Sequence, residues 1–307
     1  MSASDIREGQ TFSGASRAVA YVNLVKLPHT VFALPFALVG VVIASYLRPL
    51  RVAHVLWVVV AFTAARFAAM AFNRIVDLDV DRLNPRTAMR ELPRGTLSVA
   101  ETWVAVGIAC AVFVYASWRL NPLCLALSPV ALAWVFFYSY TKRFTSWSHL
   151  VLGWSLAIAP VGGYLAVTGR WSHPVWLLLV LALGVATWVG GFDIFYSLQD
   201  IAFDREQRLR SMPAHLGEVG AIRIARVLHV ASVVSLALVG LGFTSGVWYW
   251  AGVLVAAALL AYEHSLVRPG ALDKLDAAFF TMNGMISITF FFFVLIDRLT
   301  QRGLLRI

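Results

Sequence analysis

The sequence predicts an all-α polytopic membrane protein, and three observations predict it. Hydrophobic residues make up 60% of the 307 positions and charged residues only 13%. The mean hydropathy is +0.77. Soluble domains carry about 25% charged residues, so this chain is too apolar to be one. The hydrophobic residues also gather in runs long enough to cross a bilayer.

Nine of these runs can cross a hydrocarbon core of about 30 Å, which takes about 17 to 25 apolar residues in a helix. The shortest run, 247–262, could also be a tilted or partial span. We therefore predict one integral-membrane domain over residues 1–307. The nine predicted spans are 29–47, 52–76, 98–118, 121–138, 149–168, 175–196, 221–243, 247–262 and 275–297.

The N-terminal segment and the cysteines add little. The first 28 residues contain several charges and no compact apolar stretch with a small-residue cleavage site, so we expect no secretory signal. Cys110 and Cys124 both fall in predicted spans, where a thiol behaves as a small hydrophobe. Two such cysteines do not make a disulfide scaffold.

The basic residues predict how the chain is oriented in the membrane. They concentrate in the N-terminal segment and in the connections after the second, fourth, sixth and eighth spans. The positive-inside rule then places the N-terminus and these connections in the cytoplasm. The membrane also explains the net charge of +9 without nucleic acid, because no single soluble face collects the charges. Arg298, Arg302 and Arg306 oppose this topology, since nine spans leave them on the far side.

A first acidic motif, 73-NRIVDLDVD-81, ends the second predicted span. On a helix that turns 100° per residue, Asn73, Asp77 and Asp81 share one face because they are four positions apart. Asp79 lies on a different side. An acidic helix end is often only a solvated cap, so this motif alone indicates little.

A second acidic motif, 193-DIFYSLQDIAFD-204, ends the sixth predicted span. Asp193, Tyr196, Asp200 and Asp204 are offset by 3, 7 and 11 positions from the first of them, which again stacks them on one helical face. Gln199 points away from that face. Two such motifs on matched helix ends are much harder to attribute to chance.

The surroundings of the two motifs are alike, which predicts two related halves. The first motif is followed by 90-RELPRG-95 and the second by 210-RSMPAHLG-217. Halves of roughly 26–145 and 146–297 would face each other across a cavity, with both acidic ends at one site. The alternative is that Arg, Pro and Gly are ordinary loop residues.

Four carboxylates brought together in this way, those of Asp77, Asp81, Asp200 and Asp204, need compensating charge. An all-oxygen set with no nearby His or Cys ligand suits Mg²⁺. Magnesium in proteins usually binds one or two carboxylates together with substrate phosphates. The sequence therefore predicts a magnesium site and a phosphorylated substrate.

Arginines beside the motifs support a phosphate ligand, since their forked donors match phosphate oxygens. Arg66 is the most informative, because an unpaired guanidinium inside a predicted span is costly. It either contacts the substrate or pairs with one of the aspartates. The others, which could equally be topology determinants, are Arg74, Arg82, Arg86, Arg90 and Arg205.

At these residues the chain resembles the UbiA superfamily of intramembrane prenyltransferases, whose motifs read NDxxDxxxD and DxxYxxxDxxxD. The likeness extends through 26-KLPHTVFALPFA-37, 138-YSYTKR-143 and 277-AFFTMNG-283. It implies a nine-helix bundle with a central cavity, in which two Mg²⁺ ions and the diphosphate of a polyprenyl donor bind.

The resemblance also assigns roles, motif by motif. Asn73, Asp77 and Asp81 match the first metal-binding set, and Asp200 and Asp204 match the second. Lys142 and Arg143 match a basic pair that contacts the diphosphate. One departure is Arg74, where the usual motif has Asp, which leaves the first set one carboxylate poorer. The variant motifs resemble those of bacterial 4-hydroxybenzoate polyprenyltransferases, including enzymes of the futalosine route to menaquinone.

The chemistry that follows is ionisation of an allylic diphosphate and attack by an aromatic ring on the resulting cation. Asp193, deeper than the metal set, is the candidate that orients or activates the acceptor; alternatively it pairs with Arg66. Tyr196 is a candidate for stabilising the cation through its ring. Arg86 and Asn283 are candidate substrate contacts.

Two other functions compete with prenyl transfer. A CDP-alcohol phosphotransferase would need a DGxxAR spacing, whereas Asp81 is followed by Arg-Leu-Asn. A divalent-cation or anion transporter would use the aspartates as its ion path, but spans 221–243 and 247–262 carry polar groups mainly near their ends. We expect an enzyme of a bacterial-type cytoplasmic membrane, with its site toward the cytoplasm and no obligate protein partner.

Overall fold

The computed structural model describes residue 12 and residues 16–270, 272, 275 and 281–301. Side chains are described throughout except at 27–32. This part of the chain contains helices and no strand elements. The helices are α1 (Arg17–Leu24), α2 (Leu27–Ala44), α3 (Val52–Val76), α4 (Leu78–Leu83), α5 (Val99–Leu120), α6 (Pro122–Tyr138), α7 (Ser148–Thr168), α8 (Trp176–Ser197), α9 (Ile201–Glu206), α10 (Met212–Gly242), α11 (Val247–Leu266) and α12 (Asn283–Gln301), with short 3₁₀ helices at Thr141–Arg143 and Leu198–Asp200.

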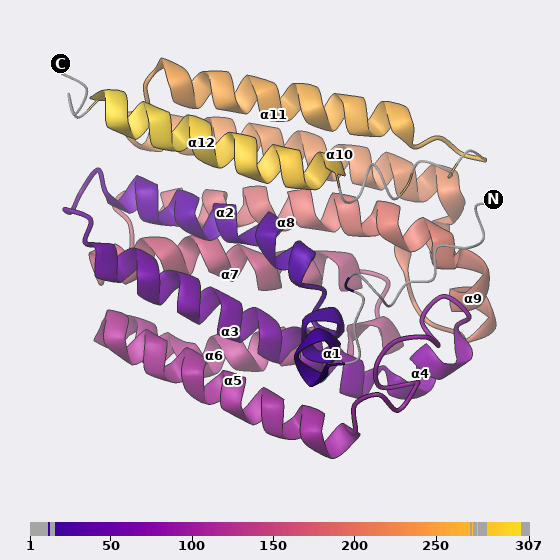
Figure 1. Ribbon diagram of the computed structural model, residues 1–307. Coiled ribbons are helices and arrows are strands. Elements are labelled where there is room, and N and C mark those ends of the chain that lie inside the picture. Colours follow the sequence, from indigo (N-terminus) through magenta and orange to yellow (C-terminus); the bar gives the residue numbers. More distant parts are fainter. Residues whose placement is uncertain (1–11, 13–15, 271, 273–274, 276–280, 302–307) are drawn as a thin grey trace.

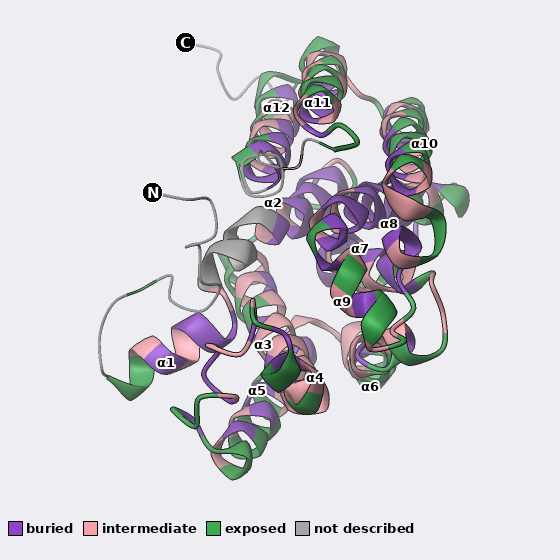
Figure 2. Cartoon of the chain, turned by 90° about the vertical axis from the view of Figure 1, so that its right-hand side faces the viewer, coloured by how far each residue is buried: buried purple, intermediate pink, exposed green. Residues whose placement is uncertain are grey.

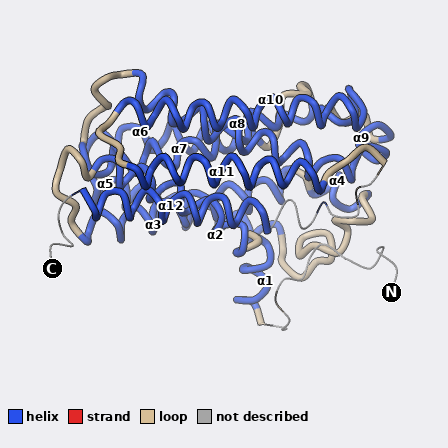
Figure 3. The backbone as a smooth tube through the Cα atoms, turned by 90° about the horizontal axis from the view of Figure 1, so that it is seen from above, coloured by secondary structure: helices blue, strands red, loops and turns tan. Residues whose placement is uncertain are grey.

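The long helices lie side by side, and the short helices α4 and α9 lie at one end of the bundle, whereas α1 lies on its flank (Figure 1). Figure 3 shows the same arrangement from above, with helix almost everywhere and loops at the two ends. Within the described residues, seven helices are long and apolar enough to cross a membrane. This confirms an all-α membrane protein, while the count of nine spans stays a prediction.

Every predicted span overlaps a helix of the bundle, and the differences have local causes. α11 is not among the seven helices counted above. Trp and Tyr near its start and Glu263 and His264 near its end lower its mean hydropathy. α10 begins at Met212 instead of near 221, but Gly217 interrupts it with φ 69° and ψ 178°. Only glycine adopts that conformation readily, so the uninterrupted helix begins close to the predicted position. The last predicted span includes 276–280, which lie outside the described residues.

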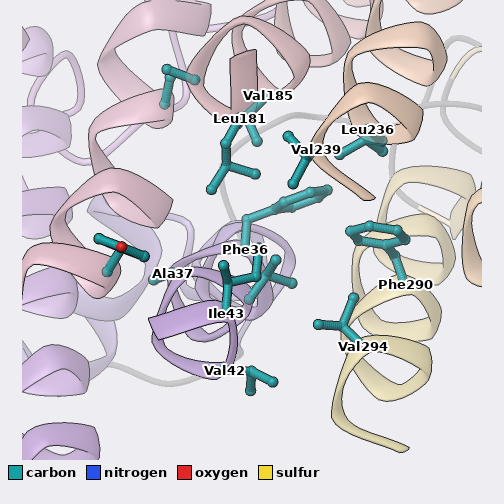
Figure 4. Close-up of a cluster of buried hydrophobic side chains, with 14 of the residues drawn as sticks. Phe36, Ala37, Val42, Ile43, Leu181, Val185, Leu236, Val239, Phe290 and Val294 are labelled. Atoms are coloured by element: carbon teal, nitrogen blue, oxygen red, sulfur yellow. The ribbon is translucent and has the colours of Figure 1, made fainter. Parts of the chain in front are cut away.

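α8 occupies the middle of the bundle. It packs against α7 and α10, and most of its residues are buried, as Figure 2 shows from the end that carries α4 and α9. A core of aromatic and branched side chains surrounds it, with Phe36 of α2 between α8, α10 and Phe290 of α12 (Figure 4). The ring centroids of Phe36 and Phe290 are 6.0 Å apart.

Small residues let the central helices approach closely, as membrane helix packing requires. A Cβ at Gly40 or Gly163 would lie 1.9 Å or 2.2 Å from backbone oxygens across the α2–α7 contact. At Gly153 of α7 it would lie 2.1 Å from the Ala186 carbonyl oxygen of α8. These glycines therefore fix how closely α7 lies against α2 and α8.

Arg298, one of the arginines that oppose the predicted topology, has polar and aromatic partners at the end of the bundle opposite α4 and α9. Arg298 donates to Ser45 Oγ at 2.8 Å, and its guanidinium lies 4.2 Å from the Tyr46 ring centroid. Asp297 accepts from the Tyr46 hydroxyl at 3.0 Å. Arg298 is thus stabilised by neighbouring side chains and the end of α2. Arg302 and Arg306 lie outside the described residues.

Candidate active site

A pocket of about 220 Å³ opens where the two acidic motifs meet, at the end of the bundle that carries α4 and α9. The structure places all the sequence-predicted site residues on its wall. They are Arg66, Asn73, Asp77, Asp81, Arg86, Lys142, Arg143, Asp193, Tyr196, Asp200, Asp204 and Asn283.

The first motif is not one continuous helix, which corrects the sequence prediction. α3 ends at Val76, Asp77 has φ −92° and ψ 7°, and α4 starts at Leu78. The four-residue spacing still holds the ligands on one side, because the Asp77 amide bonds to Asn73 O at 2.9 Å and the Asp81 amide to Asp77 O at 2.7 Å. The Asn73 side chain donates to Asp77 Oδ2 at 2.9 Å. Asp79 points away as predicted, with its side chain 94% exposed.

The second motif is interrupted in the same way. α8 ends at Ser197, a 3₁₀ turn covers Leu198–Asp200, and α9 follows. Asp200 and Asp204 are buried, whereas Gln199 is exposed as predicted. Both motifs therefore end a long helix, break, and continue in a short helix that caps the pocket. That likeness agrees with two related halves, which remain a prediction.

Arginines of the connection between α4 and α5 hold the aspartates. Arg86 reaches across to the second motif and contacts both carboxylate oxygens of Asp200, at 2.6 and 3.0 Å. Arg90 bonds both oxygens of Asp81 at 2.8 and 2.9 Å. Arg86 forms the forked pair that is the strong form of charged hydrogen bond, with two nitrogens on two oxygens, whereas Arg90 reaches both oxygens of Asp81 through Nη1 alone. The connection thus ties the two halves of the pocket together.

Two further basic side chains complete this arrangement. Arg143 lies 3.4 Å from Asp77 Oδ1 and donates to the Val76 carbonyl oxygen at 2.7 Å. Arg74, the departure from the usual motif, is buried and lies 4.0 Å from Asp81 Oδ2. It fills the space beside the first motif with a second cation facing Asp81.

The acidic side chains fit a cation that shares its shell with a substrate. Within the described residues, no three His, Cys, Asp or Glu side chains are close enough to hold a metal ion by themselves. Asp204 Oδ2, however, is buried and has no hydrogen-bond partner among the residues that the structure describes. Mg²⁺ needs only one or two carboxylates when phosphate oxygens complete its shell. These side chains therefore suit a Mg²⁺ ion whose shell is completed by a diphosphate. They do not suit an ion held by protein ligands alone.

The hydroxyl of Tyr196 joins two cations on the pocket wall. It accepts from Arg86 at 2.7 Å and from Lys26 Nζ at 3.3 Å. The Arg86 guanidinium also lies 5.0 Å from the Tyr196 ring centroid. The ring is thus in contact with two cations of the protein itself, and its predicted role beside an allylic cation stays a prediction.

The balance of charge in the pocket favours an anion. Seven basic and five acidic side chains line it. Burial and then the neighbouring Arg90 hold the pKa of Lys26 well below its ordinary value. An anionic ligand would remove that crowding of positive charge.

Asp193 has a partner that the sequence interpretation did not foresee. His149 Nδ1 lies 2.6 Å from Asp193 Oδ2, so Asp193 pairs with this histidine. The signal that could have found it is a lone imidazole at the start of an apolar span, which needs a polar partner there. Asn283, in turn, donates to Glu263 Oε1 at 3.2 Å, and Glu263 is fully buried.

The deeper part of the pocket wall, toward the middle of the bundle, is mostly apolar, although Arg66 of α3 also lines it. Its apolar residues come from α3, α7 and α8, and they begin at the level of Asp193 and continue toward the middle of the bundle. They are Met70, Leu152, Leu156, Trp188 and Phe192. The pocket is therefore densely charged where the two motifs meet and mostly apolar in its deeper part.

A helical membrane fold with a pocket that is charged at one end and mostly apolar in its depth is typical of a membrane enzyme that binds an amphiphilic anion. The family model of the UbiA prenyltransferase family matches residues 33–292. The chain belongs to the UbiA prenyltransferase family and is a prenyl-transferring enzyme. This confirms the resemblance drawn from the motifs.

Individual relatives agree. The chain is 30% identical over 210 residues to a 4-hydroxybenzoate octaprenyltransferase of Vibrio cholerae serotype O1, covering 66% of this chain and 70% of that protein. It is 29% identical over 248 residues to the 4-hydroxybenzoate octaprenyltransferase of Aeromonas salmonicida, covering 78% and 83%.

Solved structures share the fold. The apo structure of a UbiA homolog from Aeropyrum pernix K1 superimposes with a TM-score of 0.80 at 32% identity, covering 88% of this chain and 98% of that one. A UbiA homolog from Archaeoglobus fulgidus bound to DMAPP and Mg²⁺ has a TM-score of 0.69 at 20% identity, covering 91% and 98%.

Proposed function

We propose that the protein transfers a polyprenyl group from an allylic polyprenyl diphosphate to an aromatic acceptor in quinone biosynthesis. The acceptor class is 4-hydroxybenzoate-like or naphthoate-like. The observation that carries the proposal is the lining of the pocket: carboxylates and arginines surround the place where both motifs meet, and mostly apolar residues line the deeper part. The names of the bacterial relatives support a hydroxybenzoate acceptor.

The charged part of the pocket fits the diphosphate of the donor. Asp77 with Asp81, assisted by Asn73, and Asp200 with Asp204 would hold Mg²⁺. When bound, Mg²⁺ neutralises the charge that builds up on a leaving diphosphate. Lys142 and Arg143 bind the same group, and Arg86 can turn one of its donors from Asp200 to a phosphate oxygen. These cations stabilise developing negative charge.

The deeper, mostly apolar part receives the prenyl chain and keeps water from the reaction. As the allylic C–O bond breaks, its electron pair leaves with the diphosphate, and the chain carries a delocalised cation. The acceptor ring then forms a C–C bond to that carbon and loses a ring proton to a base. Asp193 is our candidate for orienting the acceptor and taking this proton, and Tyr196 lies where its ring can face the cation.

The site is expected to face the cytoplasm. The basic connections after α3, α6 and α8 surround the pocket end, and the positive-inside rule places such connections on the cytoplasmic side. Prenyl diphosphates and aromatic acids would then enter from the side on which the pocket opens.

The test is Mg²⁺-dependent release of diphosphate from geranyl and longer polyprenyl diphosphates, with a panel of aromatic acids, in purified membranes. We expect release to need the acceptor, Mg²⁺, Asp77 and Asp200, and to fall by a factor on the order of 100 or more in Asp77→Ala and Asp200→Ala. Asp79→Ala is the matched control, because its carboxylate is exposed and outside the pocket. No release from folded protein with any acceptor would overturn prenyl transfer and favour ion transport.

A further inference from the structure

Asp193 is held from behind by a histidine that does not line the pocket. The Asp193 side chain is 16% exposed and lies on the pocket wall, whereas His149 is fully buried. One oxygen of the carboxylate, Oδ2, contacts His149 Nδ1 at 2.6 Å. The other oxygen is therefore the one available to a ligand.

The second nitrogen of the imidazole fixes its tautomer. His149 Nε2 accepts from the backbone N–H of Met212 at 3.3 Å. A backbone amide can only donate, so in the neutral ring Nε2 carries no proton and Nδ1 carries it. His149 is then a donor to Asp193. Both ring nitrogens are thus engaged, Nδ1 with Asp193 and Nε2 with Met212, which holds the ring in place as a donor to Asp193.

Three rigid elements hold this arrangement. His149 lies in the first turn of α7, Asp193 near the end of α8 and Met212 at the start of α10. One turn after His149, Gly153 lets α7 touch the α8 backbone at Ala186. A side chain fixed by packing and hydrogen bonds on regular elements is held far more closely than one on a loop.

The position of Asp193 indicates what it holds. Asp193 precedes Asp200 by seven residues, about 10 Å along a helix, so it lies deeper than the predicted metal set. It is adjacent in sequence to Phe192, which lines the deeper part of the pocket. A carboxylate at the boundary between the charged and the mostly apolar parts suits the hydroxyl of an aromatic ring better than a diphosphate, which like charge would repel.

We infer that His149 is a positioning residue. It holds the Asp193 carboxylate in one orientation through Oδ2, with the other carboxylate oxygen presented to the hydroxyl group of the aromatic acceptor. The inference rests on the proposed function. It predicts that loss of the His149 donor disturbs how the aromatic acceptor is held and lowers kcat. The binding of the prenyl diphosphate should be unchanged.

Steady-state prenylation with geranyl diphosphate and 4-hydroxybenzoate tests this in purified protein. His149→Leu keeps the bulk and removes the donor, and we expect kcat to fall about 10- to 100-fold. The KM for geranyl diphosphate should change less than about twofold, since no contact to that group is altered. His149→Asn, which places an N–H near the position of Nδ1, should recover most of kcat. His149→Gln, which places it near Nε2, should not.

A double-mutant cycle separates action through Asp193 from a general structural effect. If His149 acts through Asp193, then His149→Leu causes little further loss in an Asp193→Asn background. Should His149→Leu fail to fold, the comparison of Asn with Gln decides, after thermal unfolding has shown that both variants are folded.

Three results would overturn the inference: wild-type kcat in His149→Leu, equal activity of the Asn and Gln variants, or fully additive losses in the cycle. Each of these presupposes an active wild-type enzyme, so they count against His149 alone. A wild type that prenylates no aromatic acceptor would overturn the proposed function and this inference with it.

Discussion

At the scale of single residues, carboxylates of the pocket form ion pairs with its arginines. Arg86 and Asp200 are largely buried, with side chains 21% and 10% exposed. Removing one partner of such a pair leaves the other charge in a poorly solvated place. The same guanidinium also donates to Tyr196, so Arg86 connects the α4–α5 connection to two residues of the second motif.

Arg86→Gln is therefore expected to lower the free energy of unfolding by about 1–3 kcal/mol. Thermal unfolding in detergent measures it. Added Mg²⁺ should raise the Tm more in the variant than in the wild type, because Asp200 is then free to bind it. Arg82→Gln is the matched control, since Arg82 pairs with Asp79 3.7 Å away at an exposed site, where ion pairs contribute little. Equal Tm changes in the two variants would contradict the prediction.

Residues whose chemistry depends on local spacing were predictable from the sequence. Asn73, Asp77 and Asp81 stay on one side of their chain segment even though the helix breaks at Asp77, because i to i+4 backbone hydrogen bonds survive the break. The pairing of Asp193 with His149 was not predictable, since it joins positions 44 apart on different helices. Hydropathy and spacing carry no information about which helices meet.

At the scale of elements, the contact between α7 and α8 positions the deep part of the pocket. The predicted spans 149–168 and 175–196 agree closely with α7 and α8, because long apolar runs are a local signal. The closeness of their contact is set by Gly153, whose role is visible only once Ala186 is placed opposite it.

Gly153→Ala should be clearly destabilising. The added Cβ would lie 2.1 Å from the Ala186 carbonyl oxygen, so the helices must separate. We expect a loss of about 1–3 kcal/mol, as for other overpacked sites, measured by thermal unfolding. Gly162→Ala on the same helix is the control: its Cβ meets nothing within 4 Å, and alanine favours a helix interior. A loss as large in Gly162→Ala would show that the close α7–α8 contact is not the cause.

At the scale of the whole molecule, the question is which end faces the cytoplasm and how many helices cross. An odd number of crossings puts the N- and C-terminal ends of the bundle on opposite sides. Figure 1 agrees with that, because α1 lies on the flank nearer the pocket end and α12 runs away from that end. Arg298 then lies on the far side, where Ser45 and Tyr46 stabilise it.

Single cysteines read by a membrane-impermeant maleimide test this topology, in a background in which Cys110 and Cys124 are replaced by serine. Leu83→Cys lies at the pocket end, and its side chain is 62% exposed. Val175→Cys lies at the other end, between α7 and α8, and is 60% exposed. In intact cells we expect labelling at 175 and protection at 83, and labelling at both after lysis, because the basic connections hold the pocket end in the cytoplasm. Labelling at 83 in intact cells would reverse the orientation and place the carboxylates, and any prenyl diphosphate they bind, on the outer face.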